Sequence, residues 1–156
     1  MAAGNFPTSL SELEPWRKAN GVTAEEARRR LVQFVVLVSV ASSTRLFASL
    51  ALKGGNALRF IHGNRRSTID LDFTAEGDFP DDPDSIRGLL NAAFRGALRQ
   101  YQVKVRCQSV KRNPKRPEAT LPTYAVRPAS SSRAIGTIRI STNGRVLLRL
   151  SSWKSA

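Results

Sequence analysis

The sequence is poor in the side chains that form disulfides and metal clusters. Among its 156 residues there are one cysteine, Cys107, and one histidine, His62. A single cysteine excludes an internal disulfide and a cysteine-based zinc cluster, so the chain fits a reducing compartment without requiring one. We expect Cys107 to pack in the core, and His62 to interact with a helix end in preference to acting as a general base.

Acidic residues are also scarce, with 12 Asp and Glu against 25 Lys and Arg and a net charge of +13. Such a charge favours polyanionic partners through electrostatic steering and the release of counterions. The basic residues recur in clusters at 28–30, 65–66 and 111–116. Each cluster by itself is equally consistent with a solvated surface.

No segment has the composition of a leader peptide or a membrane span. The opening stretch, MAAGNFPTSLSELEPW, lacks a basic region followed by an apolar core. The most hydrophobic run, from Phe34 to Leu52, contains several serines and has Arg45 near its middle. Because a central arginine is costly in lipid, we expect a cytoplasmic protein with no membrane partner.

The apolar pattern predicts a domain of the α+β class, in which helices flank a mixed β-sheet. Residues 1–21 are expected to be a loop-like arm, because prolines and Gly21 interrupt them, and residues 22–156 to form a single domain. The basic stretch after Cys107 is expected to be a loop, and residues 46–52 fit either a strand or a helix. The remaining predicted elements are helices over 24–41, 56–62 and 83–102, and strands over 68–73, 123–127, 136–141 and 145–151.

Two aspartates, Asp70 and Asp72, stand one residue apart in the predicted strand over residues 68–73. Alternate residues of a strand point to one face, so their Cα atoms should lie roughly 6.6 Å apart on the same side. Carboxylates placed in this way repel each other unless a cation compensates them, and they can share the divalent ions of a phosphoryl-transfer site. The alternative is a pair of surface aspartates on the polar side of an edge strand.

A glycine pair, Gly54 and Gly55, precedes this strand and the short helix predicted between them. Glycines at a turn before a helix let backbone N–H groups approach a phosphate, whose charge the helix N-terminus also favours. A glycine pair is a weak signal by itself, because it is also a common way to turn the chain. The site is not a P-loop, since no Gly-Lys-Ser or Gly-Lys-Thr follows. The informative feature is the order of glycine turn, helix, basic segment and strand with Asp-x-Asp.

In that order, the segments LKGGNALRF and RSTIDLDF resemble the AbiEii-type nucleotidyltransferases, which are toxin components of abortive-infection and toxin–antitoxin systems. These proteins belong to the polymerase-β-like superfamily, so the resemblance implies a nucleotidyltransferase core. The resemblance is close over residues 46–73. The matching positions are Lys53, Gly54, Gly55, Leu58, Arg66, Thr68, Asp70 and Asp72.

The resemblance implies a catalytic pair, Asp70 and Asp72, that holds Mg²⁺ or Mn²⁺. It also implies transfer of a nucleotide from a nucleoside triphosphate to a hydroxyl group of RNA or protein; in some relatives the acceptor is the 3′ end of transfer RNA. An antitoxin protein is the expected partner. The residues expected to bind the nucleotide are Lys53, Gly54, Gly55, Asn56, Arg66 and Thr68.

Two departures from the family pattern leave alternatives open. The superfamily usually places a third carboxylate on a later strand, where this sequence has Arg139 and Arg149, and Glu118 is the only acid after Asp84. Family members also usually continue into a helical C-terminal domain, which suggests a truncated relative, a minimal enzyme or a degenerate remnant. One alternative function is a catalytically degenerate, basic RNA-binding module. Another is an interaction protein whose basic face binds an acidic partner.

Overall fold

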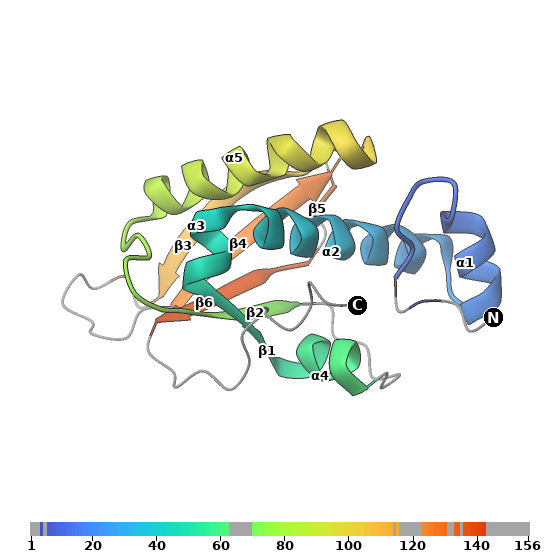
Figure 1. Cartoon of the computed structure of the whole chain (residues 1–156), viewed down its shortest axis with the longest axis horizontal. Coiled ribbons are helices and arrows are strands. Elements are labelled where there is room, and N and C mark those ends of the chain that lie inside the picture. The colour runs from blue at the N-terminus through green and yellow to red at the C-terminus, as the bar shows by residue number, and fades with distance from the viewer. Residues whose placement is uncertain are drawn as a thin grey trace.

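The computed structural model describes residue 4 and residues 6–62, 70–113, 115, 123–130, 133–134 and 136–142. Within these residues, a mixed sheet is covered on one face by two long helices (Figure 1). The predicted α+β class is therefore confirmed. None of the described helices combines the length and the hydrophobicity needed to cross a membrane.

The described strands form one sheet in the order β1-β2-β6-β4-β3, and a short strand, β5, extends it by pairing with β4. The pairing of β2 with β6 is parallel, and the other described pairings are antiparallel. The strands are β1 (Leu50–Lys53), β2 (Leu71–Ala75), β3 (Arg106–Asn113), β4 (Thr123–Ser130), β5 (Arg133–Ala134) and β6 (Ile138–Thr142).

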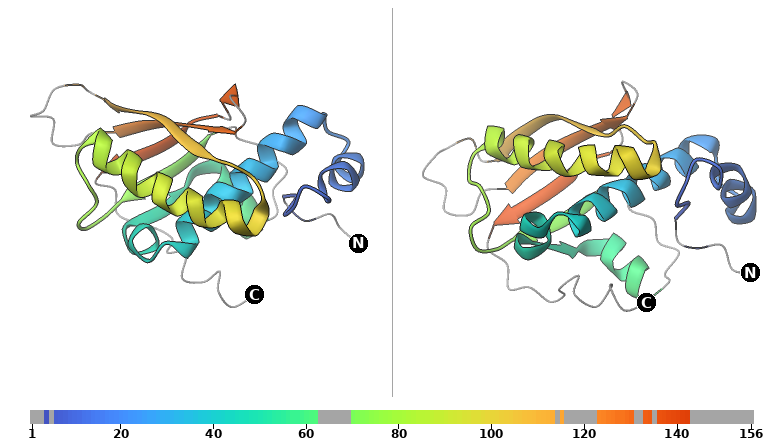
Figure 2. Two further views of the ribbon diagram at one scale, coloured as in Figure 1. Left: turned by 90° about the horizontal axis from the view of Figure 1, so that it is seen from above. Right: turned by 45° about the horizontal axis from the view of Figure 1, so that its top comes forward.

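Two long helices, α2 (Ala24–Ser42) and α5 (Pro83–Tyr101), lie on the same side of the sheet (Figure 2). Each begins at a residue that caps its free N–H groups. The Thr23 hydroxyl accepts from the backbone N–H of Glu26 at 3.1 Å, and the Asp82 carboxylate accepts from that of Ser85 at 2.7 Å. Both helices follow the prediction within one residue at each end.

Consecutive strand residues alternate between the two faces of the sheet. The face toward α2 and α5 is apolar, and Phe73, Tyr124, Val126 and Ile140 on it are fully buried. The opposite face, which we call the polar face, carries Asp72 of β2, Arg139 of β6, Ala125 and Arg127 of β4, and Lys111 of β3. The sheet therefore separates the core from a charged surface.

The expectation of a loop-like arm over residues 1–21 was wrong in part, because α1 (Leu13–Asn20) is a helix. Pro15 lies in its first turn, where no backbone N–H is needed for an intrahelical bond. Gly21 ends the helix with a left-handed φ of 62°. Trp16 is buried, and its Nε1–H donates to the carbonyl of Gly4 at 2.7 Å. This bond holds the segment before α1 against the helix.

Several boundaries also differ from the prediction. The segment 46–52 contains the end of a short helix, α3 (Thr44–Ser49), followed by β1, so both readings were correct in part. The basic stretch after Cys107 is not simply a loop, since β3 continues to Asn113. Strand β2 begins at Leu71 and leaves Asp70 just before it, whereas the strand predicted over residues 145–151 lies outside the described residues.

Candidate functional site

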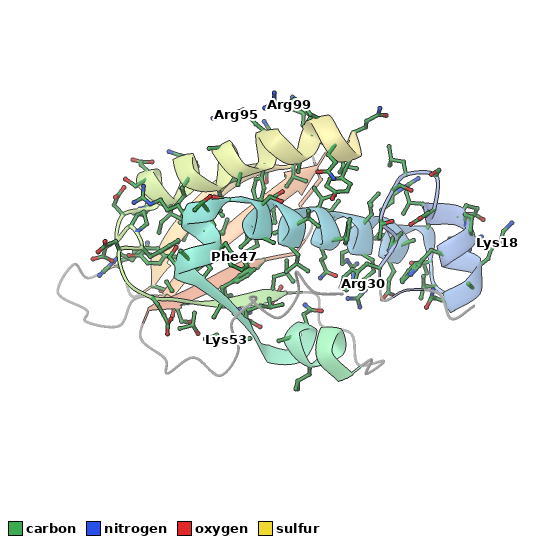
Figure 3. The ribbon with its side chains drawn as sticks, viewed as in Figure 1. Lys18, Arg30, Phe47, Lys53, Arg95 and Arg99 are labelled. Carbon is green, nitrogen blue, oxygen red and sulfur yellow. The ribbon has the colours of Figure 1, made fainter. Side chains whose placement is uncertain are left out.

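Asp72 lies on the polar face between two cationic residues. In the register of the sheet it is paired with Lys53 of β1 on one side and with Arg139 of β6 on the other. Its side chain is half-buried, and Lys53 is exposed at the end of β1 (Figure 3). The second aspartate, Asp70, immediately precedes β2 and is also half-buried. Both carboxylates are therefore partly accessible.

The glycine turn lies close to the Asp72 carboxylate. Gly54 has a φ of +77°, and a Cβ added there would lie 3.0 Å from Oδ2 of Asp72. A side chain would be strained by the backbone conformation and would also crowd this oxygen, so the close approach requires glycine. Helix α4 (Gly54–His62) begins at the same residue. Its first N–H groups, which lack intrahelical acceptors, therefore lie beside the aspartate pair.

Asn56 connects the first turn of α4 to the strand that carries the aspartates. Its side chain is only 1% exposed, and Nδ2 donates to the backbone carbonyl of Asp70 at 2.6 Å. This bond joins residues that are far apart in the sequence and fixes the spacing between the glycine turn and Asp70. The buried side chain of Asn56 therefore has a positioning role, whereas Gly54 and Gly55 are at least partly exposed.

Strand β6 and Thr137, the residue just before it, contact the two carboxylate oxygens of Asp70. Nη2 of Arg139 forms an ion pair with Oδ2 at 3.0 Å, and the backbone N–H of Thr137 donates to Oδ1 at 3.2 Å. The Arg139 side chain is 55% exposed and that of Asp70 is 28% exposed. The arginine that stands where the family pattern suggests an acid therefore compensates Asp70.

Other predicted site residues lie outside the described part of the chain. These are Arg66 and Thr68, expected to bind the nucleotide; Glu118 and Arg149, considered in relation to the third carboxylate, also lie outside the described residues. The structure therefore brings together Lys53, Gly54, Gly55, Asn56, Asp70 and Asp72, all of which surround the junction of β1, α4 and β2.

The oxygen atoms of two aspartates are the ligand type that Mg²⁺ and Mn²⁺ prefer. Asp72 fits a divalent ion, because it is partly exposed and Gly54 places no Cβ against its carboxylate. Asp70 fits as a second ligand only when Arg139 releases it. Among the described residues, no group of three or more His, Cys, Asp or Glu side chains could hold a metal ion. The donor set thus supports binding through Asp72 and, conditionally, Asp70.

The contact between Arg139 and Asp70 was not predicted from the sequence. The segment Ile138-Arg139-Ile140 alternates apolar and charged residues in the same way as Leu71-Asp72-Phe73. That alternation indicates two strands that each bury their apolar face. The opposite charges on their other faces are the one sequence signal that the two strands pair. Thr137 contributes through its backbone, for which the sequence gives no signal.

Cys107 packs in the core as predicted, with an exposure of 5%. Its backbone N–H donates to Oδ1 of Asn91 of α5 at 2.8 Å. Burial raises the pKa of the Cys107 thiol to about 11. Because the thiolate is the reactive form, this residue is not a candidate nucleophile.

A hollow of about 410 Å³ lies between α2 and α5. Its lining combines serines such as Ser39 and Ser42 with apolar residues such as Val38 and Leu89, and contains no carboxylate, thiol or imidazole. Both helices cover the apolar face of the sheet, so the hollow belongs to the opposite side of the protein from the aspartate pair. It does not form part of the candidate site.

Comparisons with solved structures concern the fold of the chain. They include JHP933 from Helicobacter pylori, with a TM-score of 0.51 and 17% identity, and a second protein from H. pylori, provisionally described as a nucleotidyltransferase, with a TM-score of 0.47 and 17% identity. Each alignment covers 83% of this chain but only 48% and 50% of the respective structures, so the chain spans about half their length. At this identity, the match to JHP933 shows a shared fold.

A search of curated proteins finds no match to the chain. A sequence model does match residues 35–149, a range that includes the glycine turn, both aspartates and Arg139. That model is described as the nucleotidyl transferase AbiEii toxin of a type IV toxin–antitoxin system. Since the match extends over more than half of the sequence, the chain belongs to the AbiEii nucleotidyltransferase toxin family.

Proposed function

We propose that this protein transfers a nucleotide from a nucleoside triphosphate to a hydroxyl group of RNA, as the toxin of a type IV toxin–antitoxin pair. The observation that carries the proposal is the contact between the glycine turn and Asp72, where a Cβ on Gly54 would lie 3.0 Å from Oδ2. It places a helix N-terminus, which favours phosphate, beside a carboxylate of the kind that binds divalent ions. A protein hydroxyl is the alternative acceptor.

In this proposal the N–H groups of Gly54 and Gly55 bind the triphosphate, and the exposed ammonium of Lys53 compensates its charge. Asn56 positions Asp70 through its carbonyl bond. Asp70 and Asp72 hold Mg²⁺ or Mn²⁺, which when bound would neutralise and orient the phosphates. Arg66 and Thr68 complete the nucleotide-binding set on the strength of the family pattern.

The polar face offers a path for an RNA acceptor. Arg127 and Lys111 are exposed on β4 and β3, two and three strands away from Asp72. With strands about 4.8 Å apart and about 3.4 Å per residue, Lys111, in register with Asp72, lies roughly 14 Å from it across the sheet, and Arg127, two residues beyond Ala125, lies roughly 12 Å away. Half-buried Ala125 lies between Arg139 and Lys111 in the register and places no bulky side chain there. An RNA chain whose phosphates bind this face would place its terminal hydroxyl near the site. This arrangement favours RNA over protein as the acceptor.

A cognate antitoxin and a cytoplasmic location are further parts of the proposal. They rest on membership of the toxin family and on the net charge of +13, which suits an acidic protein as well as RNA. Co-purification of a stoichiometric acidic protein with the toxin would support the first part. Fractionation of cells that express the untagged protein tests the second.

The decisive experiment incubates the protein with total RNA, Mg²⁺ and each α-labelled nucleoside triphosphate in turn. We expect one or more nucleotides to label RNA, and Asp70→Ala combined with Asp72→Ala to abolish the label. The matched control is Glu76→Ala combined with Asp78→Ala, which removes two exposed acids from the loop after β2. Equal labelling by the Asp70/Asp72 variant and the wild type would show that the aspartates are not the catalytic pair.

The ion pair between Arg139 and Asp70 favours a second candidate, a catalytically degenerate RNA-binding module. In such a protein the arginine would compensate Asp70 permanently, and the polar face would bind RNA without chemistry. This candidate predicts salt-sensitive RNA binding that neither Mg²⁺ nor nucleotides change. The labelling experiment separates the two functions, because the module would bind RNA and transfer nothing.

A further inference from the structure

Asp70 is held by three contacts of different kinds. Asn56 binds its carbonyl at 2.6 Å, the N–H of Thr137 binds Oδ1 at 3.2 Å, and Arg139 binds Oδ2 at 3.0 Å. The first two fix the position of the residue, and only the third carries a compensating charge. We infer that Arg139 is a resident cation that occupies Asp70 in the nucleotide-free protein and withholds it from divalent ions.

The register of the sheet explains why Arg139 is suited to this role. Parallel pairing of β2 with β6 sets Arg139 beside Asp72, while its guanidinium reaches Asp70. The arginine therefore lies against both members of the aspartate pair from a strand whose position the sheet fixes. A divalent ion shared by the two carboxylates would have to approach the oxygen that Nη2 already contacts.

The exposure of the pair makes the contact exchangeable. Arg139 is 55% exposed and Asp70 28% exposed, and ion pairs with this access to water are weak and readily broken. The guanidinium can leave without exposing a buried charge, because both groups are already partly solvated. Arg139 thus suppresses ion binding to Asp70 without abolishing it.

The release of Asp70 rests on the proposed function, because the natural displacing group would be a triphosphate. Its oxygens can accept two parallel hydrogen bonds from a guanidinium, whereas Arg139 contacts only Oδ2 of Asp70. When the nucleotide takes Arg139, Asp70 becomes available beside Asp72. Nucleotide and divalent ion then favour each other's binding, and each binds poorly alone.

The test is a titration of Mn²⁺ into the protein without nucleotide, with free Mn²⁺ measured by electron paramagnetic resonance. We expect Arg139→Gln to bind Mn²⁺ about 10-fold more tightly than the wild type, because a competing charge in contact with the ligand is removed. The matched control is Arg127→Gln, an exposed arginine on the same face of the neighbouring strand. It removes the same charge without a contact to Asp70, so we expect a change below about 2-fold.

The dependence on Asp70 is tested by combining Arg139→Gln with Asp70→Asn, which should cancel the gain. Arg139→Met keeps an apolar stem of similar length and should repeat the result of Arg139→Gln if glutamine disturbs folding. Equal affinities for the Arg139→Gln and Arg127→Gln proteins would overturn the inference, as would a gain that survives Asp70→Asn. Because the titration contains neither nucleotide nor RNA, its result stands whether or not the labelling experiment detects transfer.

Discussion

Along β2 and β6, neighbouring residues belong to two faces with opposite properties. Phe73 and Ile140 are paired in register and are fully buried under the helices. Asp72 and Arg139, one residue earlier on each strand, are also paired, and they face the polar side. Burial of large apolar side chains stabilises the fold, whereas partly solvated charges contribute little to it. Substitutions on one face should therefore change stability, and those on the other should change binding and catalysis.

The largest effect on stability is expected from Phe73→Ala. Removing this side chain from the core leaves a cavity and should lower the free energy of unfolding by roughly 3–5 kcal/mol. Activity per folded molecule should stay near that of the wild type, because the side chain points away from the site. Urea unfolding followed by circular dichroism measures the first quantity, and the labelling assay below the unfolding midpoint measures the second.

The adjacent residue provides the control for this experiment. Asp72→Asn should leave the unfolding midpoint almost unchanged and reduce nucleotide transfer by roughly 10²–10³-fold, since a group that stabilises transition-state charge is lost. If Asp72→Asn unfolded the protein as readily as Phe73→Ala, the separation of the two faces would be wrong.

A smaller effect is expected from Gly54→Ala. The positive φ of 77° should cost roughly 1–2 kcal/mol for a residue with a Cβ, and that atom would lie 3.0 Å from Oδ2 of Asp72. Transfer activity should fall as well, because the carboxylate must move. The thermal midpoint and the labelling assay are measured on the same preparation.

The matched control is Gly88→Ala in α5, where an added Cβ meets nothing within 4 Å. Alanine is the better helix former, so this variant should be stabilised by roughly 0.5–1 kcal/mol with unchanged activity. Equal effects at the two glycines would mean that the turn at Gly54 is not specially constrained.

The sequence predicted the parts of the fold that depend on local signals. The cap and first-turn acids of α2, and the apolar spacing of α5, identified both helices that cover the sheet. The glycine pair and Asp-x-Asp were recognised at their positions, although contact between them depends on α4 folding back toward β2. Helix α1 was missed because Pro15 was taken as an interruption, when it lies in the first turn.

The long-range pairing could not be predicted. Arg139 meets Asp70 because β2 pairs in parallel with β6, a strand more than sixty residues later, and periodicity does not specify which strands pair or in which register. Strand β3 was missed in part because the basic residues Lys111 and Arg112 are typical of loops. An edge strand tolerates such charges, which also protect it from pairing with other chains.

RNA binding should distinguish the polar face from the helical surface. Lys111→Gln combined with Arg127→Gln removes two exposed charges from the polar face. If each contacts a phosphate, the slope of log affinity against log salt should become less steep by about 2. Filter binding of a labelled RNA at several salt concentrations measures this slope.

The control is Arg95→Gln combined with Arg99→Gln, which removes the same charge from the exposed side of α5 (Figure 3). This pair should leave the slope nearly unchanged. A similar loss for both variants would show that RNA responds only to net charge. Loss of an acidic protein partner, with RNA binding intact, would instead assign the polar face to that partner.

The smallest effect on function is expected at Cys107, which faces the buried side of the sheet beside Asn91 of α5. Its pKa of about 11 lies above the ordinary value of 9.0, because burial disfavours the thiolate. Below pH 9, alkylation by iodoacetamide should therefore be on the order of 10²-fold slower in the native protein than in urea.

The sign of the pKa shift also determines how stability depends on pH. The neutral thiol of Cys107 contributes its full stability below pH 9, and this contribution is lost as the pH rises toward 11. Cys107→Ala should remove that part of the alkaline destabilisation, and rapid labelling of the native protein at pH 8 would show that the apolar face is more open than its burial implies.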